Sequence, residues 1–92
     1  MELKELEYIV AVAEERSISK AADRLYLAQS SLSQYVSRYE AELGVKLFRR
    51  TSGGVRTTAA GELFLKNARQ MLLQYHQVRQ QLTDLDAPME GR

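Results

Sequence analysis

The stretch AQSSLSQYVSRYEAELG (residues 28–44) has the periodicity of one amphipathic helix, but its first half has an unusual composition. Four apolar side chains recur at intervals of three or four residues and therefore share one helix face: Leu32, Val36, Tyr39 and Leu43. Residues 29–39 contain no Asp or Glu, although carboxylates are favoured at the positive end of the helix macrodipole. The other side carries short hydroxyls and amides instead: Ser30, Gln34 and Ser37, flanked by Ser33 and Arg38. Gly44 is placed to end the helix.

Upstream of this stretch, the sequence predicts two further helices with a short break between them. Apolar residues at helical spacing indicate an amphipathic helix over about residues 2–15, which RSIS (residues 16–19) interrupts. Ser19 has the side chain of an N-cap for a short helix, KAADRLY (residues 20–26). A brief turn then leads into the helix that begins at Gln29. Two short helices joined by a tight turn predict a helix-turn-helix over about residues 18–37.

Downstream, VKLFRRTSGGVRTT (residues 45–58) changes to the period of extended structure. Val45 and Leu47 alternate with polar neighbours, and the pair Gly53-Gly54 supplies a tight turn before VRT. The sequence therefore predicts a small β-hairpin over about residues 45–57. Thr58 follows the hairpin and can cap the next helix.

The last helix is predicted over residues 59–86 and carries an apolar seam with heptad spacing. At 1.5 Å per residue it spans about 40 Å, which is longer than a domain of this size is wide. Its outer half has nothing in the same chain to contact, so we expect a second copy to cover it in a two-fold homodimer. Packing of the seam inside the domain is the alternative. The predicted interface residues are Phe64, Ala68, Met71, Tyr75, Val78 and Leu82.

The composition is that of one small globular domain, with 92 residues, of which 45% are hydrophobic and 27% charged. The absence of cysteine excludes disulfides and thiolate metal sites. No apolar run is long enough to span a membrane, and the acidic N-terminus does not fit a signal peptide, so we expect a cytoplasmic protein. The net charge is only +1, but residues 16–58 hold eight basic and three acidic residues, which indicates a face that meets an anion.

These elements predict a mainly α fold: a winged helix-turn-helix of three helices and a small β-hairpin wing in residues 1–58, followed by a long linker helix. In such a fold the second helix of the motif enters a DNA major groove, and the wing touches the flanking backbone. A helix start without acids does not repel phosphates, and Ser hydroxyls and Gln amides can donate and accept at base edges. We therefore predict sequence-specific binding of double-stranded DNA by a homodimer. The base-reading candidates are Gln29, Ser30, Ser31, Ser33 and Gln34, and the backbone candidates are Ser19, Lys20, Ser37, Arg38, Arg50 and Arg56.

Four motifs, in order along residues 3–71, resemble the N-terminal DNA-binding domain of LysR-type transcriptional regulators. They are S-x-x-x-A-A-x-x-L from residue 17, Q-x-x-L-S from residue 29, E-x-E-L-G-V-x-L-F-x-R from residue 40 and T-x-A-G from residue 58. The resemblance implies a transcriptional regulator whose bases are read by Gln29, Ser33 and Gln34. Gln34 stands where the family often has Arg, which implies a preference for adenine rather than guanine.

The resemblance also bears on the wing and on the C-terminal end of the chain. Gly53 and Gly54 stand where the family usually has a basic residue that enters the minor groove, so we assign the wing contacts to Arg50 and Arg56. Residues 87–92 fall in what resembles the hinge to an effector-binding domain, through which such proteins bind a small molecule. The sequence leaves open the operator, the effector, activation against repression, and whether the full-length protein is a dimer or a tetramer.

Other classes of function explain less of the sequence. A helical dimeric adaptor that acts by protein contacts without DNA accounts for the linker helix but not for the acid-free helix start. RNA binding lacks the expected stacking aromatics, because Tyr35 and Tyr39 lie on or beside the buried stripe. His76 is the only histidine, and no phosphate loop or nucleophile motif is present, so we predict no enzyme, no cofactor and no metal site.

Overall fold

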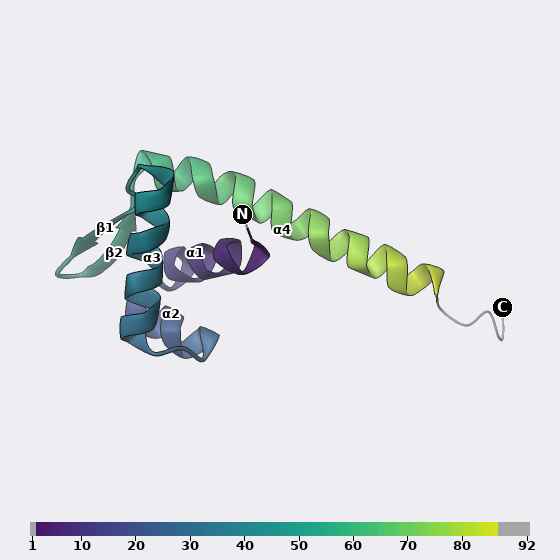
Figure 1. Ribbon diagram of the computed structural model, residues 1–92, viewed down its shortest axis with the longest axis horizontal. Helices are drawn as coiled ribbons and strands as arrows, with labels where there is room; N and C mark the ends of the chain where they lie inside the picture. The colour runs from purple at the N-terminus through teal and green to yellow at the C-terminus, as the bar shows by residue number, and fades with distance from the viewer. Residues whose placement is uncertain (1, 87–92) are drawn as a thin grey trace.

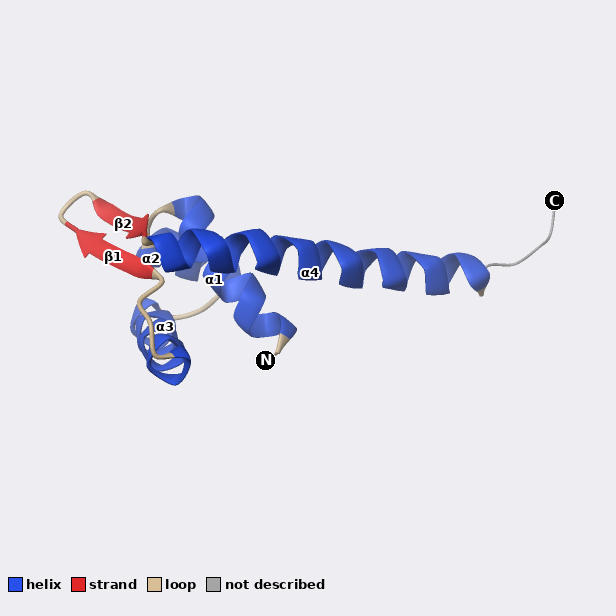
Figure 2. Cartoon of the chain, turned by 90° about the horizontal axis from the view of Figure 1, so that it is seen from above, coloured by secondary structure: helices blue, strands red, loops and turns tan. Residues whose placement is uncertain are grey.

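The computed structural model describes residues 2–86. Within them, four helices and one β-hairpin follow one another in the predicted order. The elements are α1 (Leu3–Glu15), α2 (Ile18–Leu25), α3 (Gln29–Leu43), β1 (Phe48–Thr51), β2 (Gly54–Thr57) and α4 (Ala59–Leu85). The first three helices form a compact group, and the C-terminal half of α4 projects away from it (Figure 1). The hairpin and the free end of α4 lie at opposite ends of the long axis (Figure 2). The predicted hinge at residues 87–92 lies outside the described residues.

Helix α1 lies at the centre of the fold, because it contacts α2, α3, α4 and β2. Its side chains Leu6, Ile9 and Val12 are almost completely buried. Ala21 and Ala22 of α2 are buried as well, and their small side chains let α2 cross close to α1. From α3, Leu32, Val36 and Tyr39 complete the core, whereas Leu43, which was predicted to share their stripe, remains 40% exposed.

The start of α2 differs from the prediction. Ser17, not Ser19, is the N-cap: its backbone is extended, and its hydroxyl accepts a hydrogen bond of 3.1 Å from the Lys20 amide. Ser19 therefore lies within the first turn of the helix. The helix ends one residue earlier than predicted, at Leu25, because Tyr26 adopts a left-handed conformation with φ of 59°.

Helix α3 begins and ends where the sequence predicts. Ala28 occupies the N-cap position, and its methyl side chain offers no acceptor to the first backbone N–H groups of the helix. No side-chain capping hydrogen bond is therefore present at this end. Gly44 ends the helix in a left-handed conformation with φ of 75°. The helix start therefore presents its backbone N–H groups at an exposed end.

The hairpin is shorter than predicted, and its turn lies one residue earlier. Thr51 pairs with Gly54, so the turn residues are Ser52 and Gly53 rather than Gly53 and Gly54. Gly54 is the first residue of β2, with φ of 124°, and a Cβ there would lie 2.5 Å from the Arg16 carbonyl oxygen. The glycine thus lets the wing approach the end of α1, where the Val55 amide donates to the same carbonyl at 3.1 Å.

Residues 45–47, predicted as strand, instead connect α3 to the hairpin. Glu40 of α3 is buried, and its Oε2 accepts hydrogen bonds from the Leu47 amide at 2.7 Å and the Phe48 amide at 3.0 Å. These amides are therefore used by a side chain and not by a strand partner. Thr58 caps α4 as predicted, since its hydroxyl accepts from the Gly61 amide at 3.0 Å.

Helix α4 has two different halves. Leu65 and Ala68 are buried in the core of the same chain, and the Phe64 ring packs edge-on against Tyr39 with 5.7 Å between centroids. Leu72 is half-buried against the same core, and residues 73–86 are all exposed. Ala68, which was predicted in the dimer seam, is 1% exposed in the single chain and is therefore a core residue.

Candidate nucleic-acid interface

The N-terminal half of α3 presents an exposed polar surface beside the turn from α2. Gln29, Ser30, Ser31 and Gln34 are exposed, as are Ser37 and Arg38 one to two turns further along. Ser33 is half-buried. No acidic side chain lies in the first turn of the helix, so the positive end of the macrodipole is not neutralised within its own helix.

The start of α2 adds hydroxyls and one cation. Ser19 and Lys20 are both exposed, and the Ser19 hydroxyl lies 3.1 Å from that of Ser17. Arg24, at the other end of α2, is held differently: it forms ion pairs with Glu14 at 2.8 Å and Glu15 at 3.2 Å. The hydrogen bond to Glu14 raises the pKa of Arg24. Within residues 2–86 Lys20 has no ion-pair partner, whereas Arg24 is balanced by Glu14 and Glu15.

The three arginines of the wing have different surroundings. Arg49 and Arg56 are paired across the hairpin, so their side chains share one face of it, and both are exposed. Arg50 pairs with the buried Val55 and reaches α3, where its Nη1 donates to the Ser33 hydroxyl at 2.8 Å. Its Nη2 also lies 3.5 Å from the Ser33 carbonyl oxygen. Arg50, predicted to contact the DNA backbone, is therefore hydrogen-bonded to Ser33, predicted to read a base.

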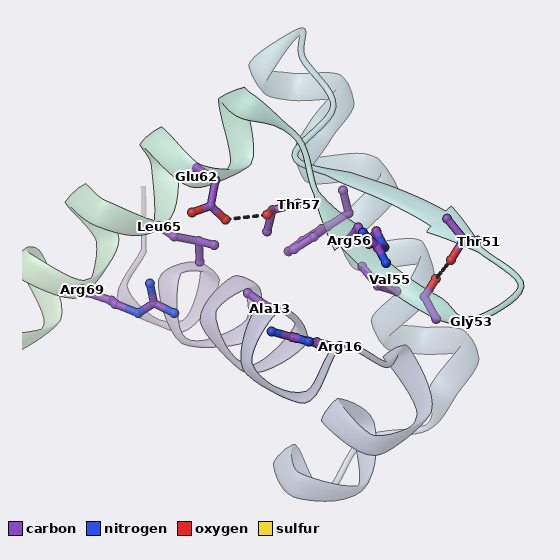
Figure 3. A pocket seen from close by; sticks show the side chains of 12 residues that line it. Ala13, Arg16, Thr51, Gly53, Val55, Arg56, Thr57, Glu62, Leu65 and Arg69 are labelled. Carbon is purple, nitrogen blue, oxygen red and sulfur yellow. Dashed lines mark hydrogen bonds between the residues drawn. The ribbon is translucent and has the colours of Figure 1, made fainter.

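A hollow of about 570 Å³ lies where the wing meets α1 and α4 (Figure 3). Three arginines line it: Arg16 at the C-cap of α1, Arg56 of β2 and Arg69 of α4. Glu62 also lines it, but its carboxylate accepts a hydrogen bond from the Thr57 hydroxyl. The sequence does not predict that Arg16 and Arg69 lie near each other, because no spacing rule connects the C-cap of α1 with α4 across a hairpin.

The tyrosines of α3 are packed and are not free to stack on bases. Tyr35 meets the Tyr8 ring at 4.8 Å between centroids, and the Arg38 guanidinium lies 5.5 Å from the Tyr35 centroid. Burial, together with the negative charges of Glu5 and Glu2, raises the pKa of Tyr35 to about 12. Tyr35 is therefore neutral and engaged within the fold at physiological pH.

The outer half of α4 exposes a row of apolar side chains. The exposed fractions are 45% for Met71, 40% for Tyr75, 39% for Val78 and 61% for Leu82. Phe64 is only half-buried, but it is already in contact with Tyr39 of the same chain. The seam predicted from heptad spacing is therefore divided: its first part fills the core, and its second part lies on the surface.

Two other kinds of structural feature are absent from residues 2–86. No helix in that range is both long and apolar enough to cross a membrane. No three His, Asp or Glu side chains in it come together in a way that could hold a metal ion. His76 is exposed on α4 and lies beside Tyr75, with 5.8 Å between the ring centroids.

A helix presented at a tight turn, with a two-stranded hairpin beside it, defines a winged helix-turn-helix protein. Comparison with known proteins gives the family. The chain belongs to the family described as bacterial regulatory helix-turn-helix protein, lysR family, whose model matches residues 3–62.

Two relatives and two solved structures illustrate the similarity. The chain is 49% identical over 77 residues to the HTH-type transcriptional regulator AlsR of Bacillus subtilis (strain 168), covering 84% of this chain and 26% of AlsR. It is 47% identical over 72 residues to the HTH-type transcriptional regulator BenM of Acinetobacter baylyi (strain ATCC 33305 / BD413 / ADP1), covering 78% of this chain and 24% of BenM. The chain thus spans about a quarter of the length of these relatives.

The solved structures cover nearly the whole chain. The crystal structure of a BenM_DBD/catB site 1 DNA complex matches with a TM-score of 0.90 and 40% identity, over 96% of this chain and 99% of that one. The crystal structure of a CbnR_DBD-DNA complex matches with a TM-score of 0.85 and 34% identity, over 95% and 100% of the two chains.

Proposed function

We propose that this chain is the DNA-binding part of a LysR-type transcriptional regulator and binds operator DNA as a homodimer. The observation that carries the proposal is the exposed, acid-free N-terminal half of α3, with the basic wing beside it. The similarity to protein–DNA complexes of 40% and 34% identity supports the same arrangement on DNA. The relatives are named as transcriptional regulators, which supports a regulator that is not an enzyme.

In this proposal, α3 lies in the major groove with its N-terminal half toward the bases. Gln29 and Gln34 offer amides that match the N6 and N7 edge of adenine, and Ser30 and Ser31 offer hydroxyls that can donate or accept. Their exposure leaves all four free to reach a base edge. Ser33, the fifth candidate, is held by the wing.

The remaining polar candidates contact phosphates. Lys20 and Arg38 flank the α3 surface, and Arg56 extends from the wing. Ser19 and Ser37 can add hydroxyl donors to the same backbone. If Lys20, Arg38 and Arg56 of both protomers neutralise six phosphates, the logarithm of the binding constant falls with the logarithm of salt with a slope of about −5.

The outer half of α4 is the proposed dimer interface. Met71, Tyr75, Val78 and Leu82 are each between 39% and 61% exposed, so covering them contributes about 1 kcal/mol per side chain. A partner copy that presents the same seam is the simplest cover, because a two-fold interface uses one patch twice. Two recognition helices at a fixed separation then fit two half-sites of one operator.

The proposal also extends to the full-length regulator and its effector. Since the relatives are about four times as long as the matched segment, we infer that a small-molecule effector acts through a domain beyond this chain. We infer a cytoplasmic protein, because that is where a bacterial regulator meets operator DNA. A dimer or a tetramer of the full-length protein fits equally well.

Binding measurements at two salt concentrations test the proposal against the protein-binding adaptor. Fluorescence anisotropy with a generic duplex should show affinity falling about 1,000-fold between roughly 50 and 200 mM salt, as the slope of −5 requires. An adaptor without a DNA site would give no saturable binding at either concentration. Absence of binding at low salt would overturn the proposal.

A further inference from the structure

The contact between Arg50 and Ser33 joins the wing to the middle of the base-reading surface. The Arg50 Nη1 donates to the Ser33 Oγ at 2.8 Å, and its Nη2 lies 3.5 Å from the Ser33 carbonyl oxygen. The two residues are 17 positions apart in the sequence, one on α3 and the other on β1. We propose that Arg50 is a positioning residue that makes Ser33 a hydrogen-bond donor toward the base edge. The proposal rests on the DNA-binding function proposed above.

The chemistry of the two side chains sets the direction of this hydrogen bond. A guanidinium has only N–H donors, so the Ser33 oxygen accepts in this contact. The Ser33 proton is then directed elsewhere, and a helical hydroxyl commonly donates to the carbonyl four residues back. Thr83 of α4 makes such a bond to the Arg79 carbonyl at 3.0 Å, whereas Ser33 makes none within residues 2–86. The Ser33 O–H is therefore left for an external acceptor.

A donor at this position discriminates between bases. In the major groove, guanine presents N7 and O6, adenine presents N7 and thymine presents O4 as acceptors, whereas cytosine presents the N4 amino group as a donor. A free serine can rotate to satisfy either kind of edge. Arg50 occupies one of the two acceptor lone pairs of Ser33 and the O–H has no acceptor within residues 2–86, so Ser33 favours the acceptor edges over the cytosine amino group on the strand that it contacts.

The position of Arg50 is fixed from both sides of the hairpin. On one side, the buried Glu40 binds the Leu47 and Phe48 amides at the start of β1, which ties the strand to the second half of α3. On the other side, Val55, the partner of Arg50 across the hairpin, donates its amide to Arg16 at the end of α1. β1 is thus held against α3 at Glu40 and again at Ser33. In this proposal Arg50 positions Ser33, whereas the sequence predicts a phosphate contact for it.

The inference is tested by selecting bound sites from random duplexes with the wild type, Arg50→Ala, Ser33→Ala and the double variant, with Arg56→Ala as the control. We expect Arg50→Ala and Ser33→Ala to lose base preference at the same symmetric pair of positions. Affinity for the selected site should fall about 2- to 10-fold per half-site, which is the range for one neutral hydrogen bond. The double variant should lose no more preference at that position than either single variant. Arg56→Ala should weaken binding to all sequences alike.

A second set of measurements separates positioning from simple charge. Arg50→Lys keeps the charge but not the planar pair of donors, so it should keep the salt slope and still lose the preference. The inference would be overturned if Arg50→Ala lost affinity equally for all sequences and its salt slope became shallower by about 2 per dimer. It would also be overturned if Arg50→Lys restored the wild-type motif. Ser33→Ala leaves the wing sequence intact and tests the same contact if Arg50→Ala folds poorly. A wild type that binds no duplex overturns the proposed function and this inference together, whereas a selective wild type with uniformly weakened Arg50→Ala overturns only the inference.

Discussion

Replacement of Glu40 tests what holds the wing to the recognition helix. Glu40 is 6% exposed, and its Oε2 accepts from two buried amides at 2.7 and 3.0 Å. Glu40→Ala leaves both amides without a partner, and each unsatisfied buried donor costs about 1–3 kcal/mol. We therefore expect the free energy of unfolding to fall by roughly 2–6 kcal/mol for the two amides together. That is a large part of the about 5–15 kcal/mol that holds a typical domain together.

Two further variants of the same site separate the hydrogen bonds from the charge. Glu40→Gln keeps an acceptor oxygen in place, so we expect it to retain more than half of the stability that Glu40→Ala loses. The Lys46 Nζ lies 3.9 Å from the Glu40 Oε1, and the Lys46 side chain is 76% exposed. An ion pair with such an exposed partner contributes only about 0–1 kcal/mol to stability. Lys46→Ala should therefore be nearly neutral.

The assay is urea unfolding followed by far-ultraviolet circular dichroism, at one fixed protein concentration because dimerisation adds to the apparent stability. Hydrogen exchange at the Leu47 and Phe48 amides reports the same site locally, and both amides should lose protection in Glu40→Ala. If Glu40→Ala costs no more than Lys46→Ala and leaves the two amides protected, the reasoning about the wing junction is wrong.

Two other predictions concern α4. A Cβ at Gly61 would lie 2.0 Å from a backbone carbonyl oxygen at the base of the wing, so Gly61→Ala should destabilise the domain by about 1–3 kcal/mol despite the better helix propensity of alanine. Gly53→Ala is the control, because its nearest neighbour would be 3.9 Å away and unfolding experiments should detect little change. Val78→Glu combined with Leu82→Glu should give a monomer in sedimentation and weaken binding to a complete operator far more than binding to one half-site. The control carries the same two charges on another face of the helix, at Gln70 and Gln77; a double seam variant that stays dimeric would show that the seam is not the interface.

The helices could be predicted from the sequence because local rules determine them. α3 and α4 begin and end where the apolar periodicity, Gly44 and Thr58 place them. The N-cap of α2 was assigned to Ser19 instead of Ser17, because both serines of RSIS have the right side chain and only the backbone conformation separates them. The predicted hairpin begins too early, at Val45, because alternation along the chain does not show that the Glu40 carboxylate accepts hydrogen bonds from the Leu47 and Phe48 amides.

The contacts that couple the elements could not be predicted in the same way. The Arg50–Ser33 contact joins residues 17 apart, and no periodic pattern relates a strand residue to a helix residue. Ala68 follows the heptad seam, yet it is buried in its own chain, because periodicity shows which face is apolar but not what covers it. The assignment of residues to base reading or to phosphate contact stays a prediction, which DNA-binding measurements test.

The most direct test of the account is site selection with the wild type and Gln34→Ala. Gln34 is exposed and lies outside the apolar stripe, so its replacement should leave the fold intact. Lys20→Ala is the control for a phosphate contact, and it should weaken binding to selected and random duplexes alike. The two variants thus separate reading of the sequence from attraction to the backbone.

For the wild type, we predict a two-fold motif with adenine–thymine pairs at the positions that Gln34 contacts. Gln34→Ala should cost about 1–3 kcal/mol on that motif and little on random DNA, with preference lost at one symmetric pair of positions. Recovery of the same motif at the same strength with Gln34→Ala would contradict the central claim that this face of α3 reads the operator.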